Sequence, residues 1–207
     1  MQKYETQLYE LLSKRYPEAK IALNFSSPLE LLVATILSAQ CTDKRVNMVT
    51  PALFKKYKTV KDYADSTDLA TDIKSINFFN NKAKNIKKMA QTLLDNFNGK
   101  VPDEMDDLIS LPGVARKTAN VVLSGAFGKN EGFIVDTHVK RISNRLGLTT
   151  NQDPVKIEKD LMAKIDQDKW GKMANLFVFL GRDVCKAPTP LCQDCTLRHI
   201  CPSSTAK

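Results

Sequence analysis

The part of the sequence that most constrains the fold lies near the middle of the chain, where a tight turn separates two apolar patterns of helical spacing. Residues 111–123 read LPGVARKTANVVL. Pro112-Gly113 marks the turn, and the residues after it place apolar side chains on one helical face without a helix breaker. Leu108 and Ile109 form the apolar run before it. The pattern predicts two helices joined by a short turn, over residues 105–124 approximately.

The start of the second predicted helix has the features of an anion site. Backbone N–H groups and the positive end of the helix dipole face outward there, an arrangement that suits a phosphate. Lys117 lies in the first turn, where the dipole disfavours an ammonium ion and makes the free amine more available. An ordinary pair of antiparallel helices with a solvated lysine is the alternative, because short motifs also match by chance.

A second candidate functional residue, after Lys117, is Asp136. It follows the short apolar run Phe133–Val135 and precedes another helical pattern. Aspartate is a favoured N-cap, and capping alone would explain this residue. Capping and catalysis can also coexist, because a helix start holds a carboxylate rigidly. His138, two residues further on, is a candidate for a supporting hydrogen bond.

Four of the five cysteines lie close together near the C-terminus, with six, two and five residues between them: Cys185, Cys192, Cys195 and Cys201. In a cytoplasmic protein this crowding indicates a metal site rather than disulfides. Zinc held by four thiolates, or by three thiolates and His199, is one occupant that the residues allow. Generic zinc sites pair two short cysteine knuckles, whereas only one such pair occurs here.

The charge balance is basic, with 31 lysines and arginines against 23 aspartates and glutamates and a net charge of +8. This balance permits nucleic acid or an anionic membrane as a partner. No apolar run approaches the roughly 18–20 residues that span a bilayer, which excludes an integral membrane protein. Glu5 and Glu10 lie near the N-terminus and no hydrophobic core of a signal follows, so we expect no signal peptide and a cytoplasmic protein.

Helical patterns dominate the rest of the chain. Residues 27–30 (SPLE) read as a capping box that opens a mostly apolar helix ending near Ala39. A strong helix is expected over 81–98, with Gly99 as its stop and a mostly solvated group of lysines, from Lys82 to Lys88, at its start. Further helices are expected at 4–16, 43–57, 60–65, 67–75 and 154–165. The predicted fold class is all-α.

Two loops between these helices carry candidate side chains. Residues 40–43 (QCTD) form a polar break after the apolar helix, and by pattern alone they read as a plain loop that caps the next helix. Residues 76–80 hold two adjacent aromatic side chains, which cannot both face one core. Phe78 is therefore a candidate for an exposed role. The alternative is that Phe78 packs in the core, because aromatic side chains are often buried.

These motifs together resemble the endonuclease III family of DNA glycosylases. The hairpin LPGVARKTANVVL followed by VDTH is similar to the helix–hairpin–helix and catalytic-aspartate signature of that family. The resemblance extends through LLVATILSAQCTD at 31–43 and IKSINFFNNKAKNI at 73–86 to the four C-terminal cysteines. It covers most of the chain.

The resemblance implies two helical lobes. One, at 22–132, contains the helix–hairpin–helix. The other, which carries the cluster, is built from residues 1–21 plus 133–207, with an iron–sulfur loop at 185–201. The spacing of the four cysteines resembles that of the family's [4Fe–4S] cluster, so this group is expected rather than zinc. A monomer associated with the nucleoid is also expected.

The activity that the resemblance implies is base excision: a damaged pyrimidine is flipped from duplex DNA, its glycosidic bond is broken and the strand is nicked. Lys117 would form a Schiff base with the sugar, and Asp136 would stabilise the cationic sugar or help to deprotonate Lys117. Gln40 would enter the gap left by the extruded base, and Phe78 matches the family's apolar wedge. No diffusible cofactor is needed. The remaining expected DNA contacts are Leu111, Gly113, Ala115 and His138.

The sequence departs from the family pattern at Ala115, where the usual hairpin has a second glycine. We expect Ala115 in the first helical turn, with a negative φ. Two alternatives to the implied function fit these residues less well. An adenine glycosylase normally lacks the lysine that is present here as Lys117. A non-catalytic DNA-binding or redox-sensing protein would not need both Lys117 and Asp136.

Overall fold

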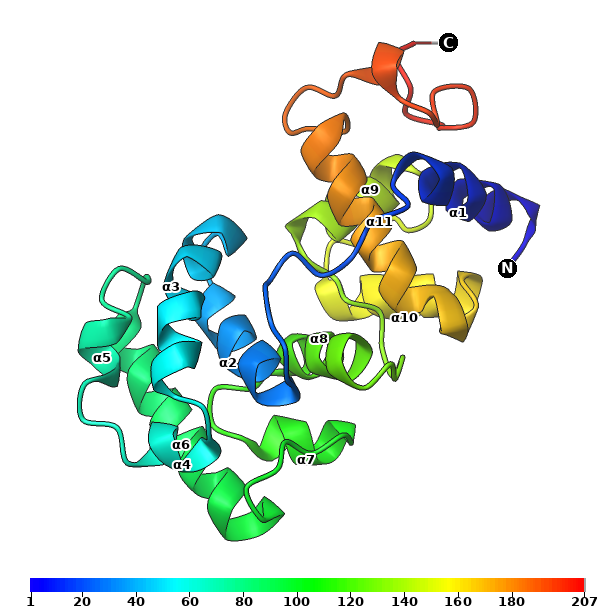
Figure 1. Cartoon of the computed structure of the whole chain (residues 1–207). Coiled ribbons are helices and arrows are strands. Elements are labelled where there is room, and N and C mark those ends of the chain that lie inside the picture. The colour runs from blue at the N-terminus through cyan, green and yellow to red at the C-terminus, as the bar shows by residue number, and fades with distance from the viewer. Residues whose placement is uncertain (207) are drawn as a thin grey trace. The chain divides into compact units, whose positions relative to one another are not determined.

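The computed structural model describes residues 1–206, which form α-helices and short 3-10 turns without a β-strand. The all-α prediction is therefore confirmed. The chain divides into two compact units (Figure 1). The hairpin unit is Ala22–Lys129, and the terminal unit joins Met1–Ile21 to the chain from Asn130 onward. Among the helices of residues 1–206, none combines the length and the apolar character that a bilayer-spanning segment requires.

The hairpin unit is organised around a buried helix, α2 (Pro28–Ser38), whose residues 31–37 are all buried. It starts at the predicted residue, because the Ser27 hydroxyl accepts the Glu30 N–H at 3.2 Å and Pro28 takes the first position. The other half of the predicted capping box differs, since the Glu30 carboxylate accepts the Ser26 N–H at 2.6 Å rather than the Ser27 N–H. Three helices of the unit contact α2: α3 (Asp43–Lys56), α6 (Phe79–Phe97) and α8 (Arg116–Ala126). The others are α4 (Val60–Ala64), α5 (Leu69–Asp72) and α7 (Met105–Ser110).

The long helix α6 begins two residues before its predicted start and ends close to the predicted stop. Asn98 and Gly99 both have positive φ, and the Gly99 N–H donates to the Leu93 carbonyl at 2.8 Å, which closes the helix end. The predicted solvated lysine group needs one correction. Lys82 is only 6% exposed, because its side chain turns inward toward the end of α2 rather than toward water.

The terminal unit has a core that joins the two ends of the chain. Leu8 and Leu12 of α1 (Lys3–Arg15) are fully buried in one cluster with Phe133 and Phe177. The helix α11 (Trp170–Asp183) contacts both α1 and α9 (Thr137–Arg145). The unit is completed by α10 (Pro154–Lys164) and by the 3-10 turns η1 (Gln167–Lys169) and η2 (Cys192–Asp194).

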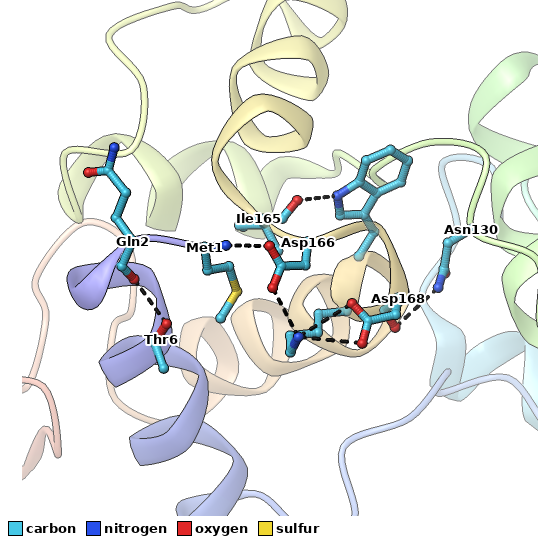
Figure 2. A network of polar contacts seen from close by, with 9 residues as sticks. Met1, Gln2, Thr6, Asn130, Ile165, Asp166 and Asp168 are labelled. Atoms are coloured by element: carbon cyan, nitrogen blue, oxygen red, sulfur yellow. Dashed lines mark hydrogen bonds and ion pairs between the residues drawn. The ribbon is translucent and has the colours of Figure 1, made fainter.

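Polar contacts around Asp166 tie the first residues of the chain into this unit (Figure 2). The N-terminal amino group pairs with the Asp166 carboxylate, which also accepts from the Lys169 ammonium at 3.1 Å. The Trp170 indole N–H donates to the Ile165 carbonyl at 2.8 Å and fixes the start of α11. The segment before α1 is therefore held beside the segment before α11.

Candidate functional site

The predicted helix–turn–helix is present as α7, a short turn and α8. The Val114 N–H donates to the Leu111 carbonyl at 3.1 Å, and both side chains are buried beneath the turn. Gly113 has a φ of +83°, and a Cβ at this position would lie 3.0 Å from the Cβ of Asn85 on α6. The turn therefore requires glycine at 113 both for its left-handed backbone and for its close approach to α6.

Ala115 corrects the sequence prediction. Its φ is negative as expected, at −93°, but its ψ of 166° is extended and it is the N-cap of α8 rather than a residue of the first helical turn. The chain needs this extended residue to pass from the turn into the helix. Because alanine has no side-chain oxygen, Ala115 makes no capping hydrogen bond. First-turn N–H groups are thus left for another acceptor, such as a phosphate.

Lys117 is the second residue of α8, and its side chain is exposed. Within residues 1–206 its ammonium has no hydrogen bond or ion pair. Its position in the first helical turn next to the hairpin is the one that the sequence predicts. The amine is therefore available to a ligand that the hairpin binds.

Asp136 is half-buried and is the N-cap of α9. Its Oδ1 accepts the Val139 N–H at 2.8 Å, so the capping interpretation is confirmed. In the part of the chain described, the carboxylate makes no further hydrogen bond, so its second oxygen can act on a ligand while the first holds the side chain still. Asp136 belongs to the terminal unit and Lys117 to the hairpin unit.

His138 lies on α9 next to Arg141. The two side chains approach at 3.1 Å between His138 Nδ1 and Arg141 Nη2. A guanidinium can only donate, so Nδ1 is the acceptor and the ring's N–H is assigned to Nε2. The same Arg141 donates to the Gly181 carbonyl of α11 at 3.1 Å, and a Cβ at Gly181 would lie 2.7 Å from His138 Nδ1. A glycine in α11 therefore makes room for this imidazole.

Gln40 and Phe78 occupy two turns that are joined to each other in the hairpin unit. Both are exposed and both have left-handed backbones, with φ of 53° and 57°. The Gln40 carbonyl accepts from the side-chain amide of Asn77 at 2.7 Å. Phe78 is 61% exposed, which excludes the alternative that it packs in the core. The structure thus brings together two residues for which the sequence predicted contacts with DNA.

The four predicted cysteine ligands line one cavity in the terminal unit. Arg145 also lines this cavity, and its Nη1 donates to Cys185 Sγ at 3.3 Å. The same guanidinium holds the loop backbone through the carbonyls of Lys186 at 2.8 Å and Pro188 at 3.0 Å. The last turns of α9 therefore support the loop that carries the cysteines.

Four cysteine thiols around one cavity are the ligand set of a [4Fe–4S] cluster. The residues that line the cavity therefore fit the group that the resemblance implies. His199 does not line the cavity, and its ring accepts from Arg198 at 2.9 Å.

Sequence reasoning missed the supporting residues Arg141, Arg145 and Lys82. Arg141 and Arg145 follow His138 by three and seven positions on one helix, a pattern that would have placed all three on one face. No comparable signal marks Lys82, because its burial depends on where the end of α2 lies.

Comparison with known proteins identifies the family. The model of the HhH-GPD superfamily base excision DNA repair protein matches residues 33–167. The chain is 51% identical to endonuclease III of Synechocystis over 97% of this chain and 93% of that protein. It is 47% identical to endonuclease III of Bacillus subtilis over 90% of this chain and 86% of that protein.

A solved structure is also similar over nearly the whole length. An endonuclease III trapped as a covalent intermediate with DNA matches with a TM-score of 0.89 and 44% identity, covering 98% of this chain and 97% of that one. The hairpin, the exposed lysine after it and the cysteine cavity are thus found in a chain that is similar to these proteins from end to end. The chain belongs to the HhH-GPD superfamily of base excision DNA repair proteins and, within it, to the endonuclease III family.

Proposed function

We propose that this chain is a bifunctional DNA glycosylase and AP lyase, which removes oxidised pyrimidines from duplex DNA and nicks the resulting abasic site. The observation that carries the proposal is Lys117, an exposed lysine in the first turn of the helix after the hairpin. Relatives named endonuclease III, one of them trapped covalently with DNA, support it. The target bond is inaccessible inside the base stack, so the nucleotide must first be flipped out.

Lys117 performs the covalent step. Its neutral amine attacks C1′ of the sugar, and the electron pair of the glycosidic bond leaves with the base. Loss of a proton from the nitrogen and opening of the sugar ring give a Schiff base. This iminium acidifies the C2′ proton, whose removal expels the 3′ phosphate oxygen and breaks the strand by β-elimination. Water then hydrolyses the Schiff base and releases Lys117.

Asp136 supplies the negative charge that this reaction needs. Its capping bond to Val139 fixes the carboxylate, and its second oxygen either stabilises the cationic sugar or accepts a proton from Lys117. His138, which Arg141 holds in place, supports the same surface and contacts DNA there. The N-terminal end of α9 therefore contributes charge, and the hairpin contributes the nucleophile.

The hairpin and two turns bind the DNA. The backbone N–H groups near Gly113 and Ala115 bind phosphate, over the buried Leu111. Gln40 enters the gap left by the flipped base, and the exposed Phe78 wedges between neighbouring bases. The protein acts on damaged or abasic duplex DNA as a monomer, in the cytoplasm and at the nucleoid.

The cysteine cavity would hold a [4Fe–4S] cluster through Cys185, Cys192, Cys195 and Cys201. When bound, this group cross-links the loop at 185–201 and so gives it a fixed shape. The loop then approaches the DNA backbone, and Lys186 is the only basic residue between the first two cysteines. The reaction itself depends on Lys117 and Asp136.

Borohydride trapping tests the covalent step. A duplex with one abasic site is incubated with protein and borohydride, which reduces the Schiff base to a stable amine, and denaturing gels report the covalent complex. Lys117→Ala is expected to lose trapping and nicking but to retain DNA binding, while Lys58→Ala, at another exposed lysine of the hairpin unit, should trap normally. Undiminished trapping by Lys117→Ala would refute the assignment of Lys117 as the nucleophile. Wild-type protein that binds the DNA and shifts it on a gel, but does not nick it, would favour a non-catalytic binder.

A further inference from the structure

The end of α2 and the start of α6 meet at a buried lysine. Lys82 is 6% exposed, and its ammonium donates to the carbonyls of Leu37 at 2.7 Å and Ala39 at 2.6 Å. These carbonyls belong to the last turn of α2, where unpaired C=O groups and the negative end of the helix dipole favour a cation. Within residues 1–206 no carboxylate pairs with this ammonium.

A buried charge without a counter-ion is costly, so the position of Lys82 calls for an explanation. Burial lowers the Lys82 pKa, in keeping with that cost. A leucine or methionine would fill the same space but would remove the donor that the Leu37 and Ala39 carbonyls have. The ammonium therefore serves the geometry of the α2 end rather than the hydrophobic core.

Two strained residues flank this contact. Gln40 follows Ala39 with a φ of 53°, and Phe78 precedes α6 with a φ of 57°. Residues other than glycine rarely adopt this left-handed conformation, and they keep it only where the surroundings determine it fully. The cause of both conformations should therefore lie in the bonds around them.

Lys82 and Asn77 supply those bonds. The Lys82 ammonium holds the Ala39 carbonyl beside Gln40. The first backbone bond of α6, from the Lys82 N–H to the Phe78 carbonyl at 3.1 Å, places this lysine one helical turn after Phe78. On the other side, the Asn77 side-chain amide donates to the Gln40 carbonyl at 2.7 Å. Each turn is thus tied to the other by two side chains, one of them buried.

We propose that Lys82 and Asn77 are positioning residues that hold the Gln40 and Phe78 turns in the conformation that enters damaged DNA. The inference rests on the roles proposed above for Gln40 and Phe78. Both side chains are exposed, so free turns would have to be ordered when DNA binds, at a cost in affinity. The side chains of Lys82 and Asn77, which we call the clamp, order both turns when the protein folds. It acts on recognition of the gap and not on the Lys117 amine.

Binding to two duplexes tests the clamp. One duplex is undamaged and the other carries a tetrahydrofuran abasic analogue, and the ratio of their dissociation constants gives the preference for damage. Lys82→Met keeps the apolar stem and removes the charge. It is expected to lower the preference about tenfold, with undamaged binding little changed. Asn77→Ala should also lower the preference for damaged DNA. Asn81→Ala, at an exposed asparagine of α6, is the matched control and should keep the preference.

A double-mutant cycle separates positioning from general damage to the fold. If Lys82 acts through the Gln40 turn, Lys82→Met should change the preference far less in a Gln40→Ala background than in the wild type. Additive losses would overturn the proposal. Asn77 is exposed, so Asn77→Ala should fold even if Lys82→Met does not, and full preference in that variant would also overturn the clamp.

The clamp and the proposed function fail in different ways. A wild-type protein that gives no borohydride-trapped complex would refute the proposed function, whatever the variants do. A wild type that traps normally, together with an Asn77→Ala variant that keeps its full preference for damage, would refute only the clamp.

Discussion

Gly113 and Ala115 lie two positions apart in the hairpin turn and meet different backbone requirements. Gly113 needs a left-handed φ and has no room for a Cβ next to Asn85. Ala115 is extended and exposed, so a side chain is tolerated there. The glycine that the family has at this second position is therefore not required by the backbone of this chain.

Ala115→Gly should raise the free energy of unfolding by about 0.5 kcal/mol, because glycine is a better N-cap than alanine. This expectation reverses the one that a place in the first helical turn would give, where alanine is favoured by roughly 0.5–1 kcal/mol. Affinity for duplex DNA should change little. Denaturant unfolding and DNA titration of the two proteins measure both effects, and a clear loss of stability in the glycine variant would contradict the N-cap assignment.

Single residues could be predicted where a local signal exists. The Pro-Gly turn, the Ser27 cap and the Asp136 cap all follow from short-range patterns, and hydrogen bonds confirm the two caps. Lys82 shows the limit of prediction from local patterns. Four lysines stand at the start of α6, and only the position of the α2 end, a tertiary feature, decides which one is buried.

At the scale of elements, α9 links two regions of the terminal unit. Asp136 begins the helix, and Arg141 and Arg145 near its end bind the backbone of the cysteine loop through the Cys185 carbonyl. The spacing of the cysteines predicted that they share a site, and they line one cavity. The two arginines could not be assigned because surface arginines on helices are common.

Protein purified without air is expected to be brown and to contain about four irons, with little zinc, per chain. Cys185→Ser should lose iron and lower the stability of the terminal unit, because the ligand that Arg145 contacts is removed. Cys41→Ser, at the cysteine of the hairpin unit, is the control. Metal analysis and thermal melts give the answer, and one zinc in place of iron would overturn the cluster assignment.

The pairing of α1 with α11 should depend on pH. Asp183 accepts from Arg15 at 2.8 Å and from the Tyr16 hydroxyl at 2.7 Å, and these bonds hold the pKa of its carboxyl below the usual range. Their contribution is therefore complete near neutral pH and is lost as the pH falls through the lowered pKa.

Asp183→Asn should consequently lower stability at neutral pH and differ less from the wild type near pH 3, below the usual aspartate pKa of about 3.9. The carboxylate is partly exposed, so the effect should be small. Thermal melts of both proteins across this range provide the measurement. A difference that stays constant with pH would show that the ion pair does not contribute.

For the whole molecule, the fold class and the family could be predicted, because helical periodicity is local and the family motifs are short and specific. The composition of the terminal unit could not be read from periodicity, since nothing in residues 1–21 indicates that they pack with segments more than a hundred positions away. Only resemblance to a family carries that information from sequence.

The proposed activity predicts a substrate spectrum. Duplexes with an oxidised pyrimidine should be cleaved, and undamaged duplexes should not. An adenine opposite an oxidised guanine should remain intact, because this chain carries Lys117, a lysine that adenine glycosylases normally lack. Product gels from a panel of such duplexes decide the matter, and excision of adenine alone would favour the adenine-glycosylase alternative.

The joining of the two chain ends in one unit has a consequence for biosynthesis. Helix α1 is synthesised more than a hundred residues before its partner α11. At ordinary rates of synthesis the delay is on the order of ten seconds. During this delay Leu8 and Leu12, which are fully buried in the folded protein, have no α11 to pack against. The hairpin unit is contiguous, so we expect it to fold during this delay, before the terminal unit is complete.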